Sequence, residues 1–219
     1  MNRLLIGTRR YSSWSLRGWL AVRVAKLNVL DQVIPLRGGG QTVEIHRISP
    51  NGMVPFLEHD GAQVWESLAI CEYCAEFAPS LWPAERIARA HARSIAAEMH
   101  AGFRGVRQAL PMNLGRDRQP RPELDEAAQK DIATIDRIWS ETRERYGAGG
   151  EYLFGSELTV ADIMFAPIVT RFRSYVIALS PRAQAYAEAI LAHPLLREWY
   201  ELAQAEPKEW LLDSYESLV

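Results

Sequence analysis

The first part of the chain alternates apolar runs of strand length with helical patterns. Residues 4–7 are apolar over the length of a short buried strand, and apolar residues between positions 16 and 27 recur at approximately helical spacing. A second strand is predicted over residues 33–36. The run Gly38-Gly39-Gly40 then predicts a mobile loop, because successive glycines lose much conformational freedom when they are ordered. The predicted order of elements so far is β-α-β.

A hairpin and a helix complete this first part. The runs 54–58 and 63–65 flank Asp60-Gly61, a dipeptide that favours the positive φ angles of a tight turn. Residues 67–77 then show a helical pattern. The resulting order, β-α-β followed by β-β-α, matches the layout of a thioredoxin-like fold.

The pattern changes after the segment Pro79-Ser80-Leu81-Trp82-Pro83, and no convincing strand alternation follows it. The remainder is rich in Ala, Glu, Arg and Leu, and prolines and glycines divide it into helical segments. We therefore predict an α/β part plus an all-α part: a thioredoxin-like domain over residues 1–79, a linker over 80–85 and an all-helical domain over 86–219. Helices are expected at residues 87–110, 123–146, 160–175, 181–192 and 194–205.

Composition and charge narrow the possible partners. The 219 residues include 25 basic and 27 acidic side chains, a formal net charge of -2, so the charge gives no reason to expect nucleic acid or an anionic membrane. Hydrophobic residues make up 48% of the chain, which suffices for a real core. The apolar stretch within residues 1–7 is too short for a signal peptide, and no run reaches transmembrane length. We expect a cytoplasmic protein.

Cys71 and Cys74 have the C-x-x-C spacing of a redox motif. They lie inside the apolar stretch 67–74, however, and not at the start of the helix after the first strand, where the helix dipole would favour a thiolate. We therefore predict that both are buried structural thiols.

Hydroxyl side chains crowd the start of the first predicted helix, in the segment Tyr11-Ser12-Ser13-Trp14-Ser15-Leu16-Arg17. Free backbone N–H groups and the positive end of the helix dipole converge at such a point, so a thiolate, carboxylate or phosphate can bind there. The alternative is that these serines only cap the helix, since serine is among the preferred N-cap residues. Taken alone, the pattern favours capping.

Two further motifs have both a structural and a binding interpretation. In Met53-Val54-Pro55 the proline has no N–H and favours an extended Val54, which would present both backbone groups to a peptide ligand if Pro55 is cis. The alternative is an ordinary proline at a strand entry. Glu66 and Ser67 begin the helix over 67–77, where they cap it or bind the ammonium and carboxylate of an amino acid terminus.

The segment Thr159-Val160-Ala161-Asp162 is a capping box that leads into an apolar stretch. It predicts the start of a buried helix, and we assign it a role in folding rather than in catalysis.

Together these motifs resemble the cytosolic glutathione S-transferase family along nearly the whole chain. The resemblance lies in their order and spacing: a serine-rich first helix start, a V-P-x-L turn, an E-S-x-A-I helix start, a Trp-Pro linker and a helical second half with a T-x-x-D box. Within the family, the serine motif that ends at Arg17 is most similar to the zeta class, whose members include maleylacetoacetate isomerases. Trp14 departs from that class, which has a cysteine there.

The resemblance implies glutathione as co-substrate and a homodimeric protein. The γ-glutamyl end would lie at Glu66 and Ser67 and the cysteinyl backbone at Val54. The other implied glutathione-binding residues are Ser15, Arg17, Gln41, Met53 and Pro55.

The glutathione sulfur would lie at Ser12 or Ser13, whose hydroxyl would donate to the thiolate. Tyr11 is a third candidate, because other classes of the family use a tyrosine near this point. A free thiol has a pKa of about 8.5. A hydrogen bond to a charged acceptor is worth roughly 1.5–3 kcal/mol and a helix N-terminus roughly 0.3–1 kcal/mol, so together they would lower the thiol pKa by about one to two units.

The electrophile would bind to the helical domain, where arginines could hold an acidic substrate bidentately. A solvated helix face is the more common role of such side chains. The candidates are Glu98, Met99, His100, Arg104, Arg107, Met112, Asn113, Arg171 and Arg173.

The predicted reaction is attack of the thiolate on an electrophilic carbon, or a reversible addition that isomerises a double bond. One alternative is a protein of the same fold that binds glutathione or a partner without catalysis. A second is a glutathione-dependent thiol-disulfide reductase, which is disfavoured because no cysteine lies at positions 11–15.

Overall fold

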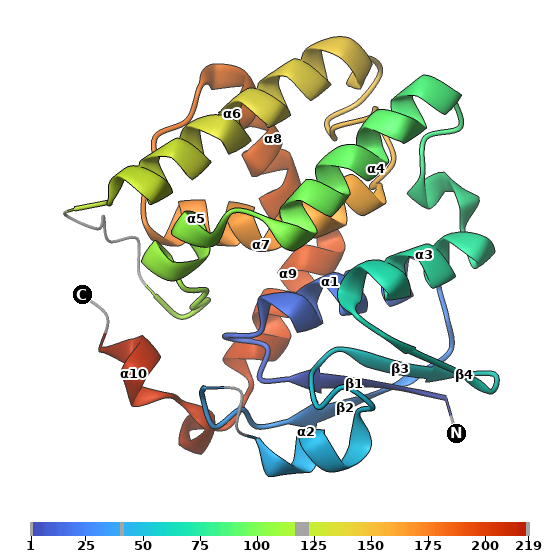
Figure 1. Ribbon diagram of the computed structural model, residues 1–219, viewed down its shortest axis with the longest axis vertical. Coiled ribbons are helices and arrows are strands. Elements are labelled where there is room, and N and C mark those ends of the chain that lie inside the picture. The colour runs from blue at the N-terminus through green and yellow to red at the C-terminus, as the bar shows by residue number, and fades with distance from the viewer. Residues whose placement is uncertain (1, 40–41, 117–122, 218–219) are drawn as a thin grey trace.

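The computed structural model describes residues 2–39, 42–116 and 123–217. A four-stranded sheet with helices on both faces lies at one end, and a bundle of helices lies against it (Figure 1). The fold is thus a thioredoxin-like domain followed by a helical domain, as predicted. The strands are β1 (Arg3–Gly7), β2 (Leu30–Ile34), β3 (Phe56–His59) and β4 (Ala62–Trp65), in the order β2-β1-β3-β4.

The alternation of side chains along β1 distributes the core over both faces of the sheet. Leu4 and Ile6 belong to the main core, which contains α1 (Ser13–Val24) and α3 (Ser67–Phe77). Leu5 points to the other face, where it packs in a smaller cluster with Ile45 of α2 (Val43–Ile48). Strand residues two apart share a face. Helices α1 and α3 consequently lie between the sheet and the bundle, as Figure 1 shows.

The strand pairing confirms the predicted hairpin and corrects one strand. β3 and β4 pair antiparallel, with His59 opposite Ala62, and both turn residues, Asp60 and Gly61, have positive φ. β2, predicted over 33–36, instead spans Leu30–Ile34 and pairs parallel with β1. The Asp31 carboxylate accepts hydrogen bonds from Trp19 and Arg23 of α1, so a polar residue is stabilised within the strand.

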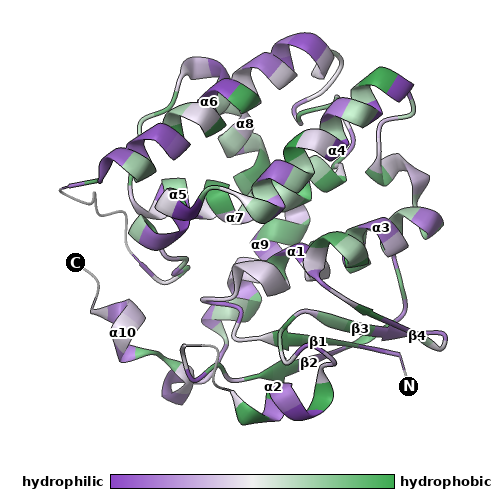
Figure 2. Ribbon diagram, in the orientation of Figure 1, coloured by the Kyte–Doolittle hydropathy of each residue, from purple (hydrophilic) through white to green (hydrophobic). Residues whose placement is uncertain are grey.

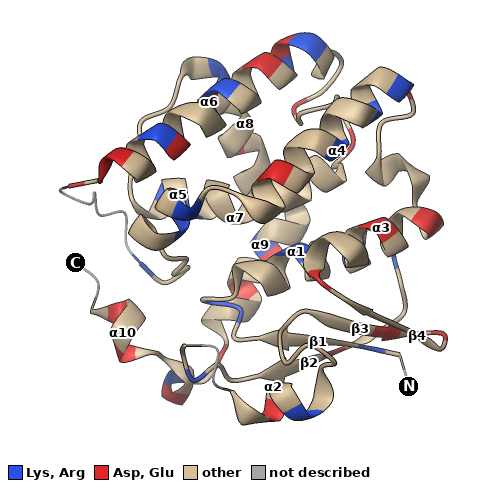
Figure 3. Cartoon of the chain, viewed as in Figure 1, with Lys and Arg blue, Asp and Glu red and all other residues tan. Residues whose placement is uncertain are grey.

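The helical domain is built around α7 (Val160–Ser174), whose residues are all buried except Arg173. A helix that is largely hydrophobic on all sides is buried in a core, whereas Figure 2 shows the outer helices with more mixed colouring. Acidic and basic residues are likewise mixed along the outer helix α6 in Figure 3. The remaining helices are α4 (Arg86–Ala101), α5 (Arg104–Ala109), α6 (Glu126–Tyr146), α8 (Pro181–Ala192), α9 (Pro194–Gln204) and α10 (Asp213–Glu216), with 3-10 turns at Pro79–Leu81 and Lys208–Trp210.

The single helix predicted over residues 87–110 is wrong, because the chain breaks it into α4 and α5. Gly102 ends α4, and Phe103 has a left-handed backbone with φ 57°. Gly105 then passes so close to α6 that an added Cβ would lie 2.6 Å from the backbone of Ala127. The break therefore redirects α5 along α6, and it brings Arg107 to the domain interface.

The two cysteines are buried structural thiols, as predicted. Cys71 and Cys74 are free thiols inside the core, and burial raises the pKa of Cys74 to about 12. Among the residues that the structure describes, none of the helices is both long and apolar enough to cross a membrane.

The capping box at the start of α7 is present as predicted and joins two segments. The Asp162 carboxylate accepts hydrogen bonds from the Thr159 N–H at 2.8 Å, from the Thr159 hydroxyl at 2.6 Å and from the Leu153 N–H at 3.0 Å. Asp162 is fully buried. The carboxylate thus satisfies donors that water cannot reach.

Replacing Asp162 by alanine should lower the free energy of unfolding by about 3 kcal/mol or more, because each buried donor left unpaired costs roughly 1–3 kcal/mol. Asp125→Ala is the matched control, since Asp125 caps α6 through the Ala128 N–H but is exposed. Loss of such a cap costs about 1 kcal/mol. Urea unfolding followed by tryptophan fluorescence measures both, and equal losses would contradict the assigned role of Asp162.

Candidate active site at the domain interface

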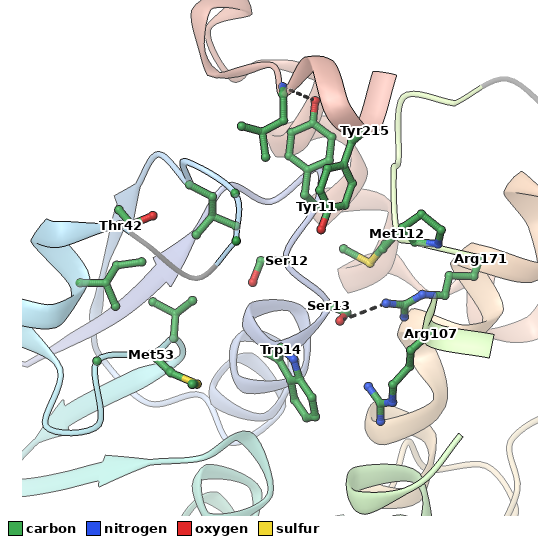
Figure 4. A pocket seen from close by; sticks show the side chains of 18 residues that line it. Tyr11, Ser12, Ser13, Trp14, Thr42, Met53, Arg107, Met112, Arg171 and Tyr215 are labelled. Carbon is green, nitrogen blue, oxygen red and sulfur yellow. Dashed lines mark hydrogen bonds between the residues drawn. The ribbon is translucent and has the colours of Figure 1, made fainter. Parts of the chain in front are cut away.

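A cavity of about 330 Å³ opens between the two domains at the N-terminus of α1 (Figure 4). Its walls come from segments far apart in the sequence: the β1–α1 loop, the loops before α2 and β3, the end of α5, helix α7 and the C-terminal segment. The lining residues are Tyr11, Ser12, Ser13, Trp14, Leu36, Gly38, Gly39, Thr42, Ile45, Gly52, Met53, Val54, Arg107, Pro111, Met112, Arg171, Leu212 and Tyr215.

Ser12 is the N-cap of α1, as the alternative interpretation of the serine cluster holds, and it also lines the cavity. Its Oγ accepts a hydrogen bond from the Ser15 N–H at 3.3 Å and donates one to the Ser15 Oγ at 2.7 Å. Within the described residues, the N–H groups of Ser13 and Trp14 donate to no acceptor. The helix therefore presents free backbone donors and a hydroxyl to the cavity, which is an anion-binding arrangement.

Ser13 faces the helical domain. Its Oγ accepts a hydrogen bond from Nη2 of Arg171 at 3.3 Å, and this bond crosses from α7 to α1 (Figure 4). Figure 4 shows Ser12 between this pair and Met53 on the opposite wall. The two adjacent serines thus serve different sides of the cavity.

The guanidinium of Arg171, on the side of the cavity that belongs to the helical domain, is held by main-chain oxygens. Nε of Arg171 donates to the Leu110 oxygen at 2.8 Å, and Nη1 donates to the Pro167 oxygen at 3.3 Å. Burial and the charge of Arg107 lower the pKa of Arg171 to about 9. Arg107 itself donates to the carbonyls of Gly102 and Met99 at the break between α4 and α5. The cavity consequently carries positive charge that an anionic ligand would stabilise.

Trp14 forms the wall between the two domains. Its ring centre lies 4.7 Å from Cζ of Arg17 and 4.8 Å from Cζ of Arg107, and the His100 ring meets it edge-on at 5.5 Å. Distances below about 6 Å allow a cation–π interaction. The indole therefore fixes the position of Arg107 beside the cavity.

Two of the predicted site residues lie beneath the cavity wall. Ser15 is fully buried, and its Oγ accepts a hydrogen bond from the Gly7 N–H at 3.0 Å, which ties α1 to the end of β1. Arg17 is also fully buried, and its Nε donates to the Met164 oxygen at 2.9 Å. Both side chains support the residues that face the cavity. Gln41 lies outside the described residues.

Val54 lines the opposite wall together with Met53, and both lie before β3 begins. The Val54–Pro55 peptide bond is cis. Pro55 is buried under α1, where an added Cβ on Gly18 would lie 2.8 Å from its Cγ. This close approach positions Val54 across the cavity from Ser12, and its backbone groups lie outside the strand ladders.

Glu66 and Ser67 lie at the start of α3, as predicted, but neither lines this cavity. Glu66 has φ 67°, and its carboxylate accepts a hydrogen bond from Asn51 at 3.3 Å and lies 3.7 Å from Nε2 of His100. The Ser67 hydroxyl is buried, and within the described part of the chain it has no hydrogen-bond partner. Buried hydroxyls are usually paired, so an unpaired one at the start of a helix is unusual.

Of the electrophile-side candidates, Arg107, Met112 and Arg171 line the cavity. Arg104, Arg173 and Glu98 are exposed, Met99 is in the core, and the buried Asn113 binds the C-terminal segment. The alternative of a solvated helix face therefore holds for Glu98, Arg104 and Arg173.

No motif in the sequence indicates the C-terminal wall of the cavity. Leu212 and Tyr215 line the cavity, and the Tyr11 hydroxyl, a predicted thiolate donor, instead donates to Glu216 at 2.5 Å and accepts from the Leu212 N–H at 3.2 Å. Burial and the bond to Glu216 raise the pKa of Tyr11 to about 12. Among the described residues, no group of three metal-binding side chains is present.

Comparison with known proteins identifies the family of this chain. The family description "Glutathione S-transferase, N-terminal domain" matches residues 11–76, and "Glutathione S-transferase, C-terminal domain" matches residues 118–202. A protein of Vibrio cholerae named "Probable maleylacetoacetate isomerase" is 30% identical over 225 residues, which cover 95% of this chain and 97% of the relative. The rat "Maleylacetoacetate isomerase" is 28% identical over 177 residues, 79% of each chain.

Solved structures share the fold. The holo structure of a bacterial maleyl pyruvate isomerase, described as a zeta-class glutathione S-transferase, superposes with a TM-score of 0.70 at 22% identity and covers 94% of this chain and 99% of its own. A glutathione transferase homologue from Burkholderia with bound glutathione gives a TM-score of 0.68 at 24% identity, with the same coverage.

Proposed function

Because this chain belongs to the glutathione S-transferase family, we propose that the cavity holds the sulfur of glutathione at Ser12 and an acidic electrophile at Arg107 and Arg171. The observation that carries this proposal is the division of the cavity. One side has a hydroxyl and free N–H groups at a helix start, and the other has two arginines that main-chain oxygens hold. Glutathione is the co-substrate.

We place glutathione along the first domain. Its γ-glutamyl carboxylate would pair with the buried, partnerless hydroxyl of Ser67, and its ammonium group would pair with Glu66. Its cysteinyl backbone would pair with Val54, whose groups lie outside the strand ladders. The predicted division at residues 79 and 86 would then assign glutathione to the first domain and the electrophile mainly to the second.

Ser12 is the proposed thiolate donor. It lies between Ser13 and the wall formed by Met53, so a cysteinyl sulfur held at Val54 would reach Ser12 first (Figure 4). Its O–H now donates to a neutral hydroxyl, that of Ser15. A charged acceptor makes roughly twice as strong a hydrogen bond as a neutral one, so the O–H would turn to the thiolate. Ser13 would instead orient Arg171.

The reaction we propose is a reversible addition. The thiolate adds to one carbon of a conjugated double bond, and the electron pair moves to the adjacent carbonyl oxygen as an enolate. Rotation about the resulting single bond and loss of the thiolate then restore the double bond in the other geometry. The curated relatives named maleylacetoacetate isomerase support this isomerisation. Arg107 and Arg171 would bind the substrate carboxylate and stabilise the enolate charge.

We further propose a cytoplasmic homodimer. Exposed apolar side chains on β4, α3 and the start of α4, namely Trp65, Phe77 and Ile87, support a self-associating surface. Light scattering of the purified protein measures its oligomeric state directly.

Ser12→Ala should raise the pKa of the enzyme-bound thiol by about one unit or more, because a hydrogen bond to a charged group is worth roughly 1.5–3 kcal/mol. Turnover should fall far more than glutathione affinity. Thiolate absorbance against pH, together with calorimetry, measures both quantities. Ser13→Ala should leave the thiol pKa nearly unchanged and should weaken binding of the acidic electrophile. Ser94→Ala, on the exposed face of α4, serves as the control.

If Ser12→Ala leaves the thiol pKa and turnover intact, Ser12 does not hold the thiolate. If the wild type binds glutathione but turns over no member of a panel of electrophiles, the non-catalytic alternative is correct.

Arg171→Met should lower kcat/KM for an acidic electrophile by about 10- to 100-fold, as loss of a charged hydrogen bond predicts. The value of kcat/KM for a neutral electrophile should fall much less. Arg173→Met is a matched control, because Arg173 lies on the same helix but is exposed. Initial rates with paired acidic and neutral substrates test this, and equal losses for both substrates would rule out carboxylate recognition by Arg171.

A further inference from the structure

The C-terminal segment 206–217, which we call the strap, returns from the end of α9 to the mouth of the cavity. In Figure 1 its helix α10 lies apart from the bundle, beyond the start of α1. Two of its side chains, Leu212 and Tyr215, complete the cavity wall, and the Tyr215 ring packs against the Tyr11 ring with centres 5.1 Å apart. The strap thus faces the space where the electrophile is proposed to bind.

Glu216 fastens the far end of the strap. Its carboxylate accepts hydrogen bonds from Nε and Nη2 of Arg10, both at 2.9 Å, from the Tyr11 hydroxyl at 2.5 Å and from Nδ2 of Asn113 at 3.2 Å. Burial opposes ionisation, but the hydrogen bonds from Arg10 and Tyr11 lower the pKa of Glu216. One carboxylate therefore joins the β1–α1 loop, the loop after α5 and the strap.

The near end of the strap is tied to the same loop. The Glu206 carboxylate accepts hydrogen bonds from the N–H groups of Arg9 at 2.8 Å and Arg10 at 3.4 Å. Between the two ends, the Leu212 N–H donates to the Tyr11 hydroxyl. The strap therefore follows the loop that carries Ser12.

The pocket for Arg10 is built closely around its guanidinium. An added Cβ on Gly115 would lie 1.9 Å from Cζ of Arg10, so a larger residue there would displace the guanidinium from this position. The Leu114 N–H also donates to the Arg10 oxygen at 3.1 Å. The loop after α5 is thus shaped to hold the cation that pairs with Glu216.

No residue of the strap is buried. Its attachment consequently depends on polar contacts and not on the hydrophobic core. Segments with few buried apolar contacts open at a small fraction of the global unfolding free energy. The strap can therefore detach from the cavity while the two domains remain folded.

We propose that the strap sets which electrophiles the cavity accepts, and that Glu216 is the positioning residue that holds Leu212 and Tyr215 in place. This inference rests on the proposed function for its substrate class. It also assigns the Tyr11 hydroxyl to the strap, so that Tyr11 shapes the electrophile side and leaves the sulfur to Ser12.

The first test measures selectivity in Glu216→Ala and Glu216→Gln. Glu216→Ala should raise KM for a small acidic electrophile by about tenfold, and should raise the relative kcat/KM of a bulky analogue by about tenfold, since one pocket contact discriminates by roughly 10- to 200-fold. Glutathione affinity and the thiol pKa should not change. Glu216→Gln, which keeps an acceptor for Tyr11 and Asn113, should fall between wild type and alanine.

The second test does not depend on catalysis. Lys208 is exposed within the strap, so limited trypsin cleavage at this site reports detachment. Cleavage should be about tenfold faster in Glu216→Ala than in wild type and unchanged in Asp213→Asn, the control on the same short helix. Tyr11→Phe should also accelerate cleavage but leave the thiol pKa unaltered.

Unchanged cleavage and selectivity in Glu216→Ala would overturn the inference, as would a raised thiol pKa in Tyr11→Phe. A wild type without turnover would contradict the proposed function, while the cleavage rates would still decide whether Glu216 holds the strap.

Discussion

The guanidinium of Arg17 lies wholly inside the protein and joins the two domains. Its Nε donates to the main-chain oxygen of Met164 on α7, and its Cζ lies 4.7 Å from the centre of the Trp14 ring. Burial, with the charges of Arg107 and Arg171, lowers the pKa of Arg17 well below its ordinary value. Within the described residues, its two Nη atoms have no hydrogen-bond partner, and an incompletely paired buried ion costs several kcal/mol. The packing of α1 between the sheet and the bundle must therefore outweigh this cost.

This contact fixes the geometry of the cavity. Because α1 is held against α7, the N-terminus of α1 faces the arginine of α7, and the Ser13–Arg171 hydrogen bond forms across the domain boundary. The same helix packs on Pro55 through Gly18, which brings Val54 to the opposite wall. One buried helix therefore sets the distance between the serine hydroxyls, the Val54–Pro55 turn and the arginines. An anion bound in the cavity would relieve part of the repulsion among the three arginines.

Elements with local signals could be predicted from the sequence, and those that depend on distant contacts could not. The Asp60-Gly61 hairpin, the Thr159 capping box and the serine-rich start of α1 each follow from residues within a few positions of one another. The break at Gly102 and Phe103 depends instead on the approach of α5 to α6. Sequence spacing also could not separate Arg107, which lines the cavity, from the exposed Arg104 one turn earlier.

The C-terminal wall of the cavity depends most strongly on contacts between residues that lie far apart in the sequence. Glu216 lies 205 residues from Tyr11, and no motif near it indicates a site. Its role arises only because α9 ends beside the β1–α1 loop, where Glu206 accepts two main-chain N–H groups. Local sequence patterns cannot predict such a pairing, since the partners lie at opposite ends of the chain.

Trp14 shows how this chain departs from the zeta-class motif without losing the chemistry proposed for the cavity. In the proposed addition and elimination steps the nucleophile is the glutathione sulfur, and the electron pair returns to that sulfur. These steps therefore need no protein thiol at position 14. What the steps require is a donor for the thiolate and positive charge for the enolate. In our proposal Ser12 and the Arg107–Arg171 pair would supply these, and the Trp14 ring lies against Arg107 beside the cavity. The tryptophan therefore changes the wall of the cavity and keeps the groups on which the proposed reaction would depend.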